Sequence, residues 1–398
     1  MEIVSILFLE AYDAGSHRAF RQGLTARSRH RIRSLTLPGR FWKWRMRGAA
    51  AWFADQLNAE LLSADSAGPI DLIFVTGFTN VADLRGLLAP PLDRVPILLY
   101  MHENQLTYPL SPEEEFDFHF GFTSIISTMA ADRIVFNSAW HRDLYLAAIP
   151  AFLNRMPEAV PRQVPDRLGP RCEVLGVGLD RAPLPGDHFP QYRGGASDPD
   201  AGPGWPRGDR PLIIWNHRWE FDKRPDVFRA AIEQLLAREL NFTVALLGES
   251  RGQEEVFTAL RDQLGSRCVA FGHQDSRADY EAWLARGDIV VSCAEQEYFG
   301  IAVAEAVHAG CYPVLPRDQV YPALYGSHCQ GRHFYTGEAE LVDLLAELVA
   351  GDSCGHVCSL DQDVDQYCWP RLAPEFDRLL AEVAAAGRCP LEPPPRRP

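Results

Sequence analysis

Short apolar runs alternate with longer amphipathic stretches along most of the chain. The runs are rich in Val, Ile and Leu, which is typical of parallel strands buried on both faces. The expected strands are 4–9, 32–37, 72–76, 97–102, 133–137, 173–177, 212–217, 242–248, 268–271, 289–293 and 312–315. Helical patterns occupy 47–62, 123–131, 225–238, 254–264, 277–285, 301–309 and 338–350. This alternation predicts the α/β class, with two doubly wound, Rossmann-like domains.

The alternation breaks once, and that break predicts the domain boundary. Residues 181–210 are rich in Pro, Gly and Asp and lack apolar periodicity, so they are interpreted as a linker or surface insertion. We expect an N-terminal domain at 1–180, a second domain at 211–372, a C-terminal helix at 373–387 and a disordered tail at 388–398. Two such domains are expected to face each other across a cleft at the carboxyl ends of their strands.

Composition narrows the class of protein. Of 398 residues, 46% are hydrophobic and 23% charged, which excludes a wholly disordered or fibrous chain. No apolar run is long enough for a transmembrane helix, so no membrane partner is expected. The apolar start lies between Glu2 and Glu10 and is interpreted as a buried strand, not a signal peptide. Nine cysteines without disulfide-scaffold spacing predict free, mostly buried thiols in a reducing cytoplasm.

The charge is unevenly distributed. The net charge of −14 argues against a polyanionic partner, yet no acid occurs between Asp13 and Asp55. Arginine forks hold phosphate and aromatic faces stack on unpaired bases, and Phe41, Trp42 and Trp44 interleave with the basic residues. A solvated basic helix and loop is the plainer alternative. The candidate RNA-binding residues here are Arg27, Arg29, Arg31, Arg33, Arg40, Lys43, Arg45 and Arg47.

The sharpest motif in the second half is EYFGIAVAE, which follows an expected strand and opens a helix. Amides of Phe299, Gly300 and Ile301 at a helix start favour an anion. Glu297 and Glu305 flank this start and could accept hydrogen bonds from sugar hydroxyls. An ordinary capped helix with solvated acids is the alternative.

Two cations follow the first strand of the second domain. Arg218 and Lys223 lie on one loop before a helix that starts near Pro225, so they could clamp a diphosphate. A surface salt-bridge loop is the alternative. Gly248, at the end of the next strand, is included in the predicted donor site.

No metal or other cofactor is expected. The chain has no Asp-x-Asp motif to hold a catalytic divalent cation. Cys354, His356 and Cys358 lack a fourth ligand at convincing spacing. Cations and backbone amides are therefore expected to neutralise the phosphates.

Polar residues also follow strands of the first domain. His102, Asn104 and Gln105 come directly after a buried strand and are expected at its carboxyl edge, where Asn104 and Gln105 would bind the acceptor RNA. Gly15 and Ser16 form a small-residue loop after the first strand, where amides could approach a phosphate or sugar. A structural role is the alternative at each of these positions.

Arg218, Lys223 and EYFGIAVAE together resemble the retaining family 4 glycosyltransferases of GT-B fold. The resemblance implies that Arg218 and Lys223 hold the donor diphosphate, that Glu297 contacts the transferred sugar and that Glu305 contacts the ribose. It also implies that His102 approaches the donor sugar.

Longer stretches of the sequence are similar to the tRNA-queuosine α-mannosyltransferases and their bacterial relatives. They are LEAYDAGSHRAF, MHENQLTYP, FNSAWHRDLYL, WNHRWEFDKRPDVF and EYFGIAVAEAVHAGCYPVLP. This resemblance implies mannose transfer from GDP-mannose to queuosine in the anticodon of an aspartate tRNA. The insertion at 181–210 departs from the family pattern. Two alternatives stay open: a polysaccharide or small-glycoside acceptor, and a non-catalytic module that binds nucleotide sugar or RNA.

Overall fold

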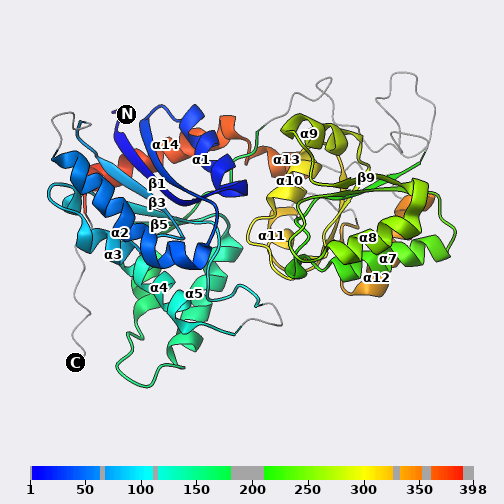
Figure 1. Cartoon of the computed structure of the whole chain (residues 1–398), viewed down its shortest axis with the longest axis horizontal. Coiled ribbons are helices and arrows are strands. Elements are labelled where there is room, and N and C mark those ends of the chain that lie inside the picture. The colour runs from blue at the N-terminus through cyan, green and yellow to red at the C-terminus, as the bar shows by residue number, and fades with distance from the viewer. Residues whose placement is uncertain are drawn as a thin grey trace. The chain divides into compact units, whose positions relative to one another are not determined.

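The computed structural model describes residues 2–62, 68–110, 115–180, 210–325, 332–351 and 360–388. It divides into two compact units, which Figure 1 shows with their helices and strands labelled. Unit 1 contains the chain up to Gly178 apart from residues 111–113, together with everything from Trp369 onward. Unit 2 contains Leu179–Cys368. Among the described residues, the chain therefore passes from one unit to the other twice, after Gly178 and after Cys368.

Unit 1 is built on a six-stranded parallel sheet of order β2-β1-β3-β4-β5-β6. Its central strands are continuous apolar runs with both faces buried, as the sequence predicted. The helices α1 and α14 lie on one side of this sheet, and α2 to α5 lie on the other (Figure 1). The strands are β1 Ser5–Asp13, β2 Arg31–Pro38, β3 Leu72–Thr76, β4 Ile97–Met101, β5 Arg133–Phe136 and β6 Cys172–Val174. The helices are α1 Gly15–Arg27, α2 Trp42–Leu61, α3 Val81–Leu87, α4 Phe118–Ala130, α5 Ala139–Leu153, α6 Val164–Leu168 and α14 Trp369–Ala386.

Unit 2 carries a second six-stranded parallel sheet, of order β12-β11-β10-β7-β8-β9. Relabelled from its first strand this is the 3-2-1-4-5-6 order of dinucleotide-binding folds, so loops after β7 and β10 meet at the switch point. The strands are β7 Leu212–Trp215, β8 Thr243–Leu247, β9 Cys268–Gly272, β10 Ile289–Val291, β11 Tyr312–Pro316 and β12 Phe334–Tyr335. The helices are α7 Pro225–Ala237, α8 Glu254–Leu264, α9 Arg277–Arg286, α10 Ile301–His308, α11 Tyr321–Tyr325, α12 Glu338–Ala350 and α13 Leu360–Asp365.

The doubly wound α/β class is confirmed, but several elements differ from the sequence prediction. Helices α1 and α5 were not predicted, and α2 begins at Trp42 instead of residue 47. Gly15 and Ser16 were expected in a loop, whereas they open α1. Arginines and small residues leave α1 with a weak apolar stripe, and its burial is supplied by α14, which is distant in sequence.

The second passage between the units lies at residues 368 and 369, within the span that the sequence assigned to one domain. Trp369 is buried in unit 1, where its indole lies over Gly23 and Gly178. A Cβ atom at either glycine would overlap that ring. The C-terminal helix therefore begins at Trp369 instead of residue 373.

Some predictions fall outside the described residues. They concern the linker at 181–209, the tail at 389–398 and the cysteines and histidine of residues 354–358. No described helix is long and apolar enough to cross a membrane.

Candidate functional site

Among the predicted site residues of unit 2, Lys223 is buried and held by several polar contacts. It ends a 3-10 turn, Phe221–Lys223, between β7 and α7, and is 6% exposed. Its Nζ donates to the Gln296 carbonyl at 2.8 Å and to Glu297 Oε1 at 3.2 Å, and lies 3.1 Å from Asp222 Oδ2. Burial lowers the pKa of Lys223, but Glu297 and Asp222 outweigh it, so the pKa is raised and the ammonium stays charged. The structure thus brings together Lys223 and Glu297, two residues that the sequence analysis assigned to the donor site.

Arg218 lies nearby and is far more exposed. Its guanidinium pairs with Glu220 at 3.0 Å, and 45% of its side chain is exposed. Burial and then the charges of Lys223 and Arg218 lower the pKa of His217 to about 3. His217 is therefore a neutral imidazole close to both cations. Each cation is paired with carboxylates, Arg218 with Glu220 and Lys223 with Asp222 and Glu297.

The start of α10 has the backbone geometry expected for an anion site. Gly300 precedes the helix with φ 75°, a left-handed conformation that glycine adopts without strain. A Cβ there would lie 2.9 Å from the Tyr321 ring. Phe299 is buried and packs edge-on against Tyr367, with ring centroids 4.9 Å apart. Ile301 opens the helix, whose first N–H groups have no intrahelical acceptor.

A steric constraint explains why position 248 is a glycine. Gly248 follows β8 with φ 121°, and a Cβ there would collide with the carbonyl oxygen of His217. The loops after β7 and β8 therefore approach so closely that only glycine fits.

Glu305 belongs to a network that the sequence did not reveal. Its Oε1 pairs with Arg277 at 2.7 Å, and its Oε2 accepts from the Tyr280 hydroxyl at 3.0 Å. Asn216 donates to that hydroxyl and to the Ala302 carbonyl. Burial raises the pKa of Glu305 against the lowering effect of Arg277. Arg277 and Tyr280 lie on α9, one turn apart, and carried no motif that would have singled them out.

In unit 1, His102 belongs to a buried stack of rings. It follows β4, is 8% exposed and lies with its ring centroid 4.0 Å from that of His17. His17 Nδ1 lies 3.2 Å from Glu10 Oε1, which also accepts from the Thr76 hydroxyl. Burial, followed by His17 and His141, places the pKa of His102 well below its ordinary value. His102 is therefore a neutral imidazole at physiological pH.

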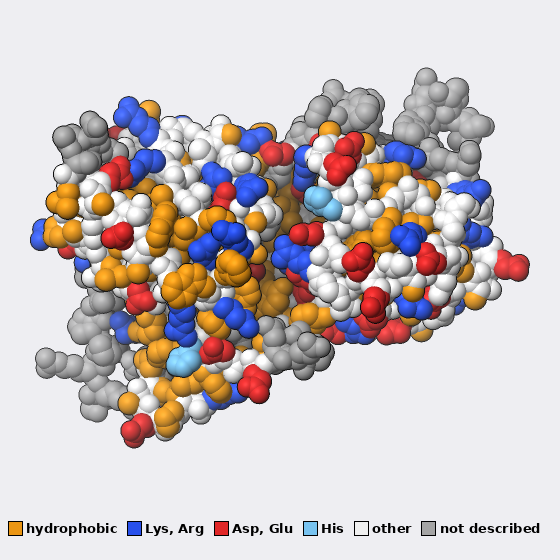
Figure 2. Space-filling view, in the orientation of Figure 1, with side chains coloured by type: hydrophobic (Ala, Val, Ile, Leu, Met, Phe, Trp, Pro, Cys, Tyr) orange, Lys and Arg blue, Asp and Glu red, His pale blue; other side chains and the backbone are white. Residues whose placement is uncertain are grey.

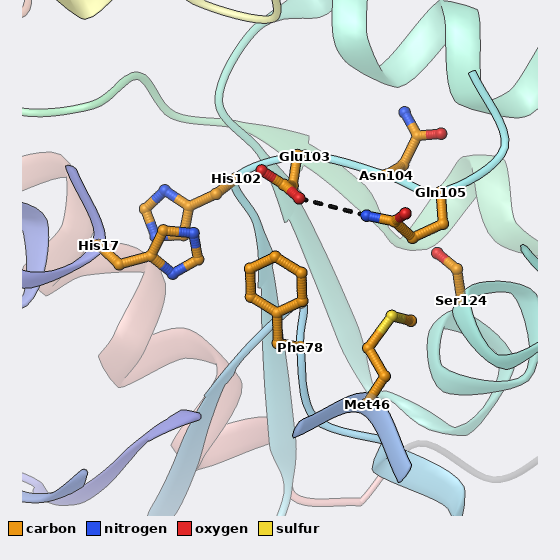
Figure 3. Close-up of a pocket in the computed structure, with 9 residues that line it drawn as sticks. His17, Met46, Phe78, His102, Glu103, Asn104, Gln105 and Ser124 are labelled. Atoms are coloured by element: carbon orange, nitrogen blue, oxygen red, sulfur yellow. Dashed lines mark hydrogen bonds between the residues drawn. The ribbon is translucent and has the colours of Figure 1, made fainter. Parts of the chain in front are cut away.

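A pocket adjoins this stack, and its lining comes from five segments of unit 1 (Figure 3). Gln105 donates to Glu103 at 3.2 Å on its wall. Asn104 lines it too, but its Oδ1 accepts from the backbone of Leu106 and from Thr107, so it shapes the loop. The lining residues are His17, Met46, Gly77, Phe78, His102, Glu103, Asn104, Gln105 and Ser124.

Three side chains here have the chemistry of metal ligands. One ligand atom from each of Glu10, His17 and His102 lies within 4.8 Å of the other two. Glu10 Oε1 already accepts three hydrogen bonds, from Tyr12, His17 and Thr76. The cluster is accordingly explained as a hydrogen-bonded core in which Glu10 orients His17, and the His102 ring packs against that of His17.

The basic residues between Asp13 and Asp55 fall into two groups in the structure. The first group contacts other polar groups or is simply exposed. Arg33 binds both oxygens of Glu60, at 2.6 and 2.8 Å, and Arg29 lies 3.8 Å from Asp377. Arg45 donates to the Pro38 carbonyl, and burial and then Arg40 lower its pKa. Arg27 reaches the Gly23 carbonyl at 3.5 Å, whereas Arg31 is exposed.

The second group lies over aromatic rings. Arg40 lies 5.7 Å from the centroid of Phe41, Lys43 lies 5.5 Å from that of Trp42, and Arg47 lies 5.3 Å from that of Phe120. All three cations are exposed. This second group forms a mixed basic and aromatic surface at the start of α2.

Family comparisons cover both units. The N-terminal model of the tRNA-queuosine alpha-mannosyltransferases matches residues 5–179. The model of the glycosyl transferases group 1 matches residues 204–359. A tRNA-queuosine alpha-mannosyltransferase of Drosophila melanogaster is 34% identical over 325 residues, which cover 80% of this chain and 81% of that protein.

Solved structures agree on the fold. The catalytic domain of starch synthase IV from Arabidopsis thaliana, bound to ADP and acarbose, aligns with TM-score 0.68 and 14% identity, covering 96% of this chain and 100% of that one. A sucrose-phosphate synthase from Thermosynechococcus elongatus aligns with TM-score 0.66, 14% identity and the same coverage. The GT-B fold is thereby confirmed. With both units matched and a relative similar over most of its length, the chain belongs to the tRNA-queuosine alpha-mannosyltransferase family of glycosyltransferases.

Proposed function

We propose that this protein transfers mannose from GDP-mannose to queuosine in the anticodon of tRNA(Asp), with retention at the anomeric carbon, in the cytoplasm. The acceptor and sugar are supported by the similarity to the Drosophila relative. The observation that carries the transfer chemistry is the position of Lys223. Its ammonium touches both Gln296 and Glu297, directly before the helix that Gly300 opens.

In this proposal the donor pyrophosphate lies against the first amides of α10. Lys223 and Arg218 offset the negative charge that grows on the phosphate as its bond to the sugar breaks. Glu297 contacts the sugar and Glu305 the ribose. The acceptor hydroxyl attacks on the face that the phosphate leaves, and the phosphate takes its proton. His102 contributes a neutral hydrogen-bonding ring to the sugar.

No metal takes part in this proposal, because two side-chain cations and a helix start supply the neutralising charge. Adding a chelator to the reaction is therefore expected to leave the rate unchanged. A chelator-sensitive rate that divalent cations restore would contradict this part of the proposal.

The test is mass analysis of tRNA nucleosides after incubation with a panel of sugar nucleotides. We expect a hexose on queuosine with GDP-mannose, and none on tRNA that lacks queuosine. Lys223→Ala and Arg218→Ala should each lower kcat on the order of a hundredfold, because each removes a preorganised contact to the leaving group.

Arg238→Ala is the matched control, since Arg238 is an exposed cation at the opposite end of α7 that pairs with Asp343. It should retain full activity. Wild-type rates in both Lys223 and Arg218 variants would refute their assigned roles, and transfer only to saccharides would favour the second candidate acceptor.

A further inference from the structure

Two large aromatic side chains at the start of α2 are exposed. Phe41 is 69% exposed and Trp44 is 63% exposed. Phe41 precedes the helix in a left-handed conformation, with φ 59°. Such a backbone conformation costs free energy for a residue with a Cβ, and burial of its ring does not offset that cost here.

The neighbouring Trp42 has the opposite environment and anchors the segment. It packs against the unit 1 core, with ring centroids 5.2 Å from Phe120 and 6.1 Å from Phe78. Trp44 lies along the helix over Gly48, where a Cβ would lie 2.7 Å from its indole. An ordered indole on a rigid helix presents its outer face to solvent with little flexibility to lose on binding.

The surroundings of these rings are positively charged. No acidic residue occurs between Asp13 and Asp55. Arg40 and Lys43, both exposed, lie over the rings of Phe41 and Trp42. On the visible face of unit 1, Figure 2 shows Lys and Arg side chains among hydrophobic ones in the region that α2 occupies in Figure 1.

Helix α2 also reaches the pocket beside His102. Met46 of α2 and Phe78, which Trp42 contacts, both line it beside His102. The turn before α2 packs against the turn before α1, since a Cβ at Gly39 would overlap that of Ala14. Trp42 and Met46, one turn apart on α2, thus connect the start of this helix to the pocket.

We propose that Phe41 and Trp44 form a stacking platform for unpaired bases of the acceptor RNA, and that Arg40 and Lys43 contact the adjoining phosphates. This rests on the proposed function and specifies how its acceptor is held. The chemistry fits a single-stranded loop, because aromatic faces stack on any exposed base while cations bind the backbone. An apolar protein partner would not require an acid-free, arginine-rich surround, so RNA is the favoured occupant.

The experiment measures the Kd of a queuosine-containing anticodon stem-loop for the wild type and for variants. Phe41→Ala and Trp44→Ala should each weaken binding roughly tenfold, because each removes one stacked base. Phe41→Tyr and Trp44→Phe should restore most of it. Arg40→Gln and Lys43→Gln should each reduce the salt dependence of binding by about one counterion.

Trp52→Ala is the matched control, since Trp52 is a partly exposed aromatic residue of the same helix that packs on Phe53. It should bind like the wild type. A fully paired RNA duplex should bind wild type and platform variants equally. Thermal unfolding of each variant shows that the fold is retained.

The outcomes separate the two proposals. If the wild type mannosylates queuosine and the Phe41 and Trp44 variants bind the stem-loop unchanged, the platform is overturned and the proposed function stands. If the variants lose binding but no sugar reaches queuosine, the platform stands and the function fails. If both variants bind RNA normally yet lose a protein partner, the surface is a protein interface and the proposal is wrong.

Discussion

His102, His141 and His217 are buried, and their environment keeps each imidazole neutral. Burial lowers the pKa of His141 to about 3, and burial together with nearby cations does the same for His217. At His102 burial acts with two neighbouring histidines. A neutral ring both donates and accepts a hydrogen bond, as the proposed contact between His102 and a sugar hydroxyl requires.

This burial predicts that the protein loses stability as the pH falls. The unfolded chain binds a proton at each of these histidines near pH 6.5. In the folded chain His141 and His217 bind one only near pH 3, and the pKa of His102 also lies well below its ordinary value. Below pH 6.5 the unfolded state therefore holds more protons, and each histidine removes up to about 1.4 kcal/mol per pH unit. Urea unfolding at pH 7.5, 6 and 5 measures this dependence.

The His141→Gln variant isolates one contribution. Its free energy of unfolding should fall less steeply with acid than that of the wild type. His119→Gln, at an exposed position in α4, should keep the wild-type dependence. A His141 variant with an unchanged slope would show that this imidazole is protonated in the folded protein.

At the scale of elements, α14 completes the fold of unit 1. Ser28 and the backbone N–H of Arg29 donate to the Asp377 carboxylate, and His30 Nε2 lies 2.8 Å from the Asp377 carbonyl oxygen. Trp369 fits over Gly23 in α1 and over Gly178 after β6. The helix therefore joins residues at both ends of the unit 1 chain.

Gly23→Ala is expected to destabilise the protein by about 1–3 kcal/mol, because the added methyl group collides with the Trp369 indole. Gly86→Ala in α3 provides the contrast, since nothing lies within 4 Å of the added methyl group. Removing a helical glycine there should be neutral or stabilise by up to about 1 kcal/mol. Chemical denaturation measures both. Equal stability of the two variants would contradict the packing described for Trp369.

At the scale of the whole molecule, the two units are not consecutive stretches of the chain. Residues from Trp369 onward follow unit 2 in the chain and yet belong to unit 1. Unit 1 is therefore completed only after unit 2 has been synthesised. The described residues of unit 2 all precede Trp369.

A chain that ends at Cys368 should consequently lose protection in unit 1 alone. Hydrogen exchange is expected to rise sharply in α1 and β2 while the β7 and β8 peptides exchange as in the wild type. A chain that ends at Arg388 keeps α14 and serves as the control. Unchanged exchange in α1 after the longer truncation would show that α14 does not stabilise unit 1.

The sequence by itself determined the alternation of strands and helices, because buried parallel strands need continuous apolar runs. It also marked Lys223, Glu297 and Gly300, because a cation, an acid and a glycine at a strand-to-helix turn leave a local signal. Tertiary structure alone decided which arginines are paired, that Arg277 and Tyr280 hold Glu305, and that α14 packs on α1. These depend on contacts between residues distant in sequence, where periodicity and spacing carry no information about which side chains meet.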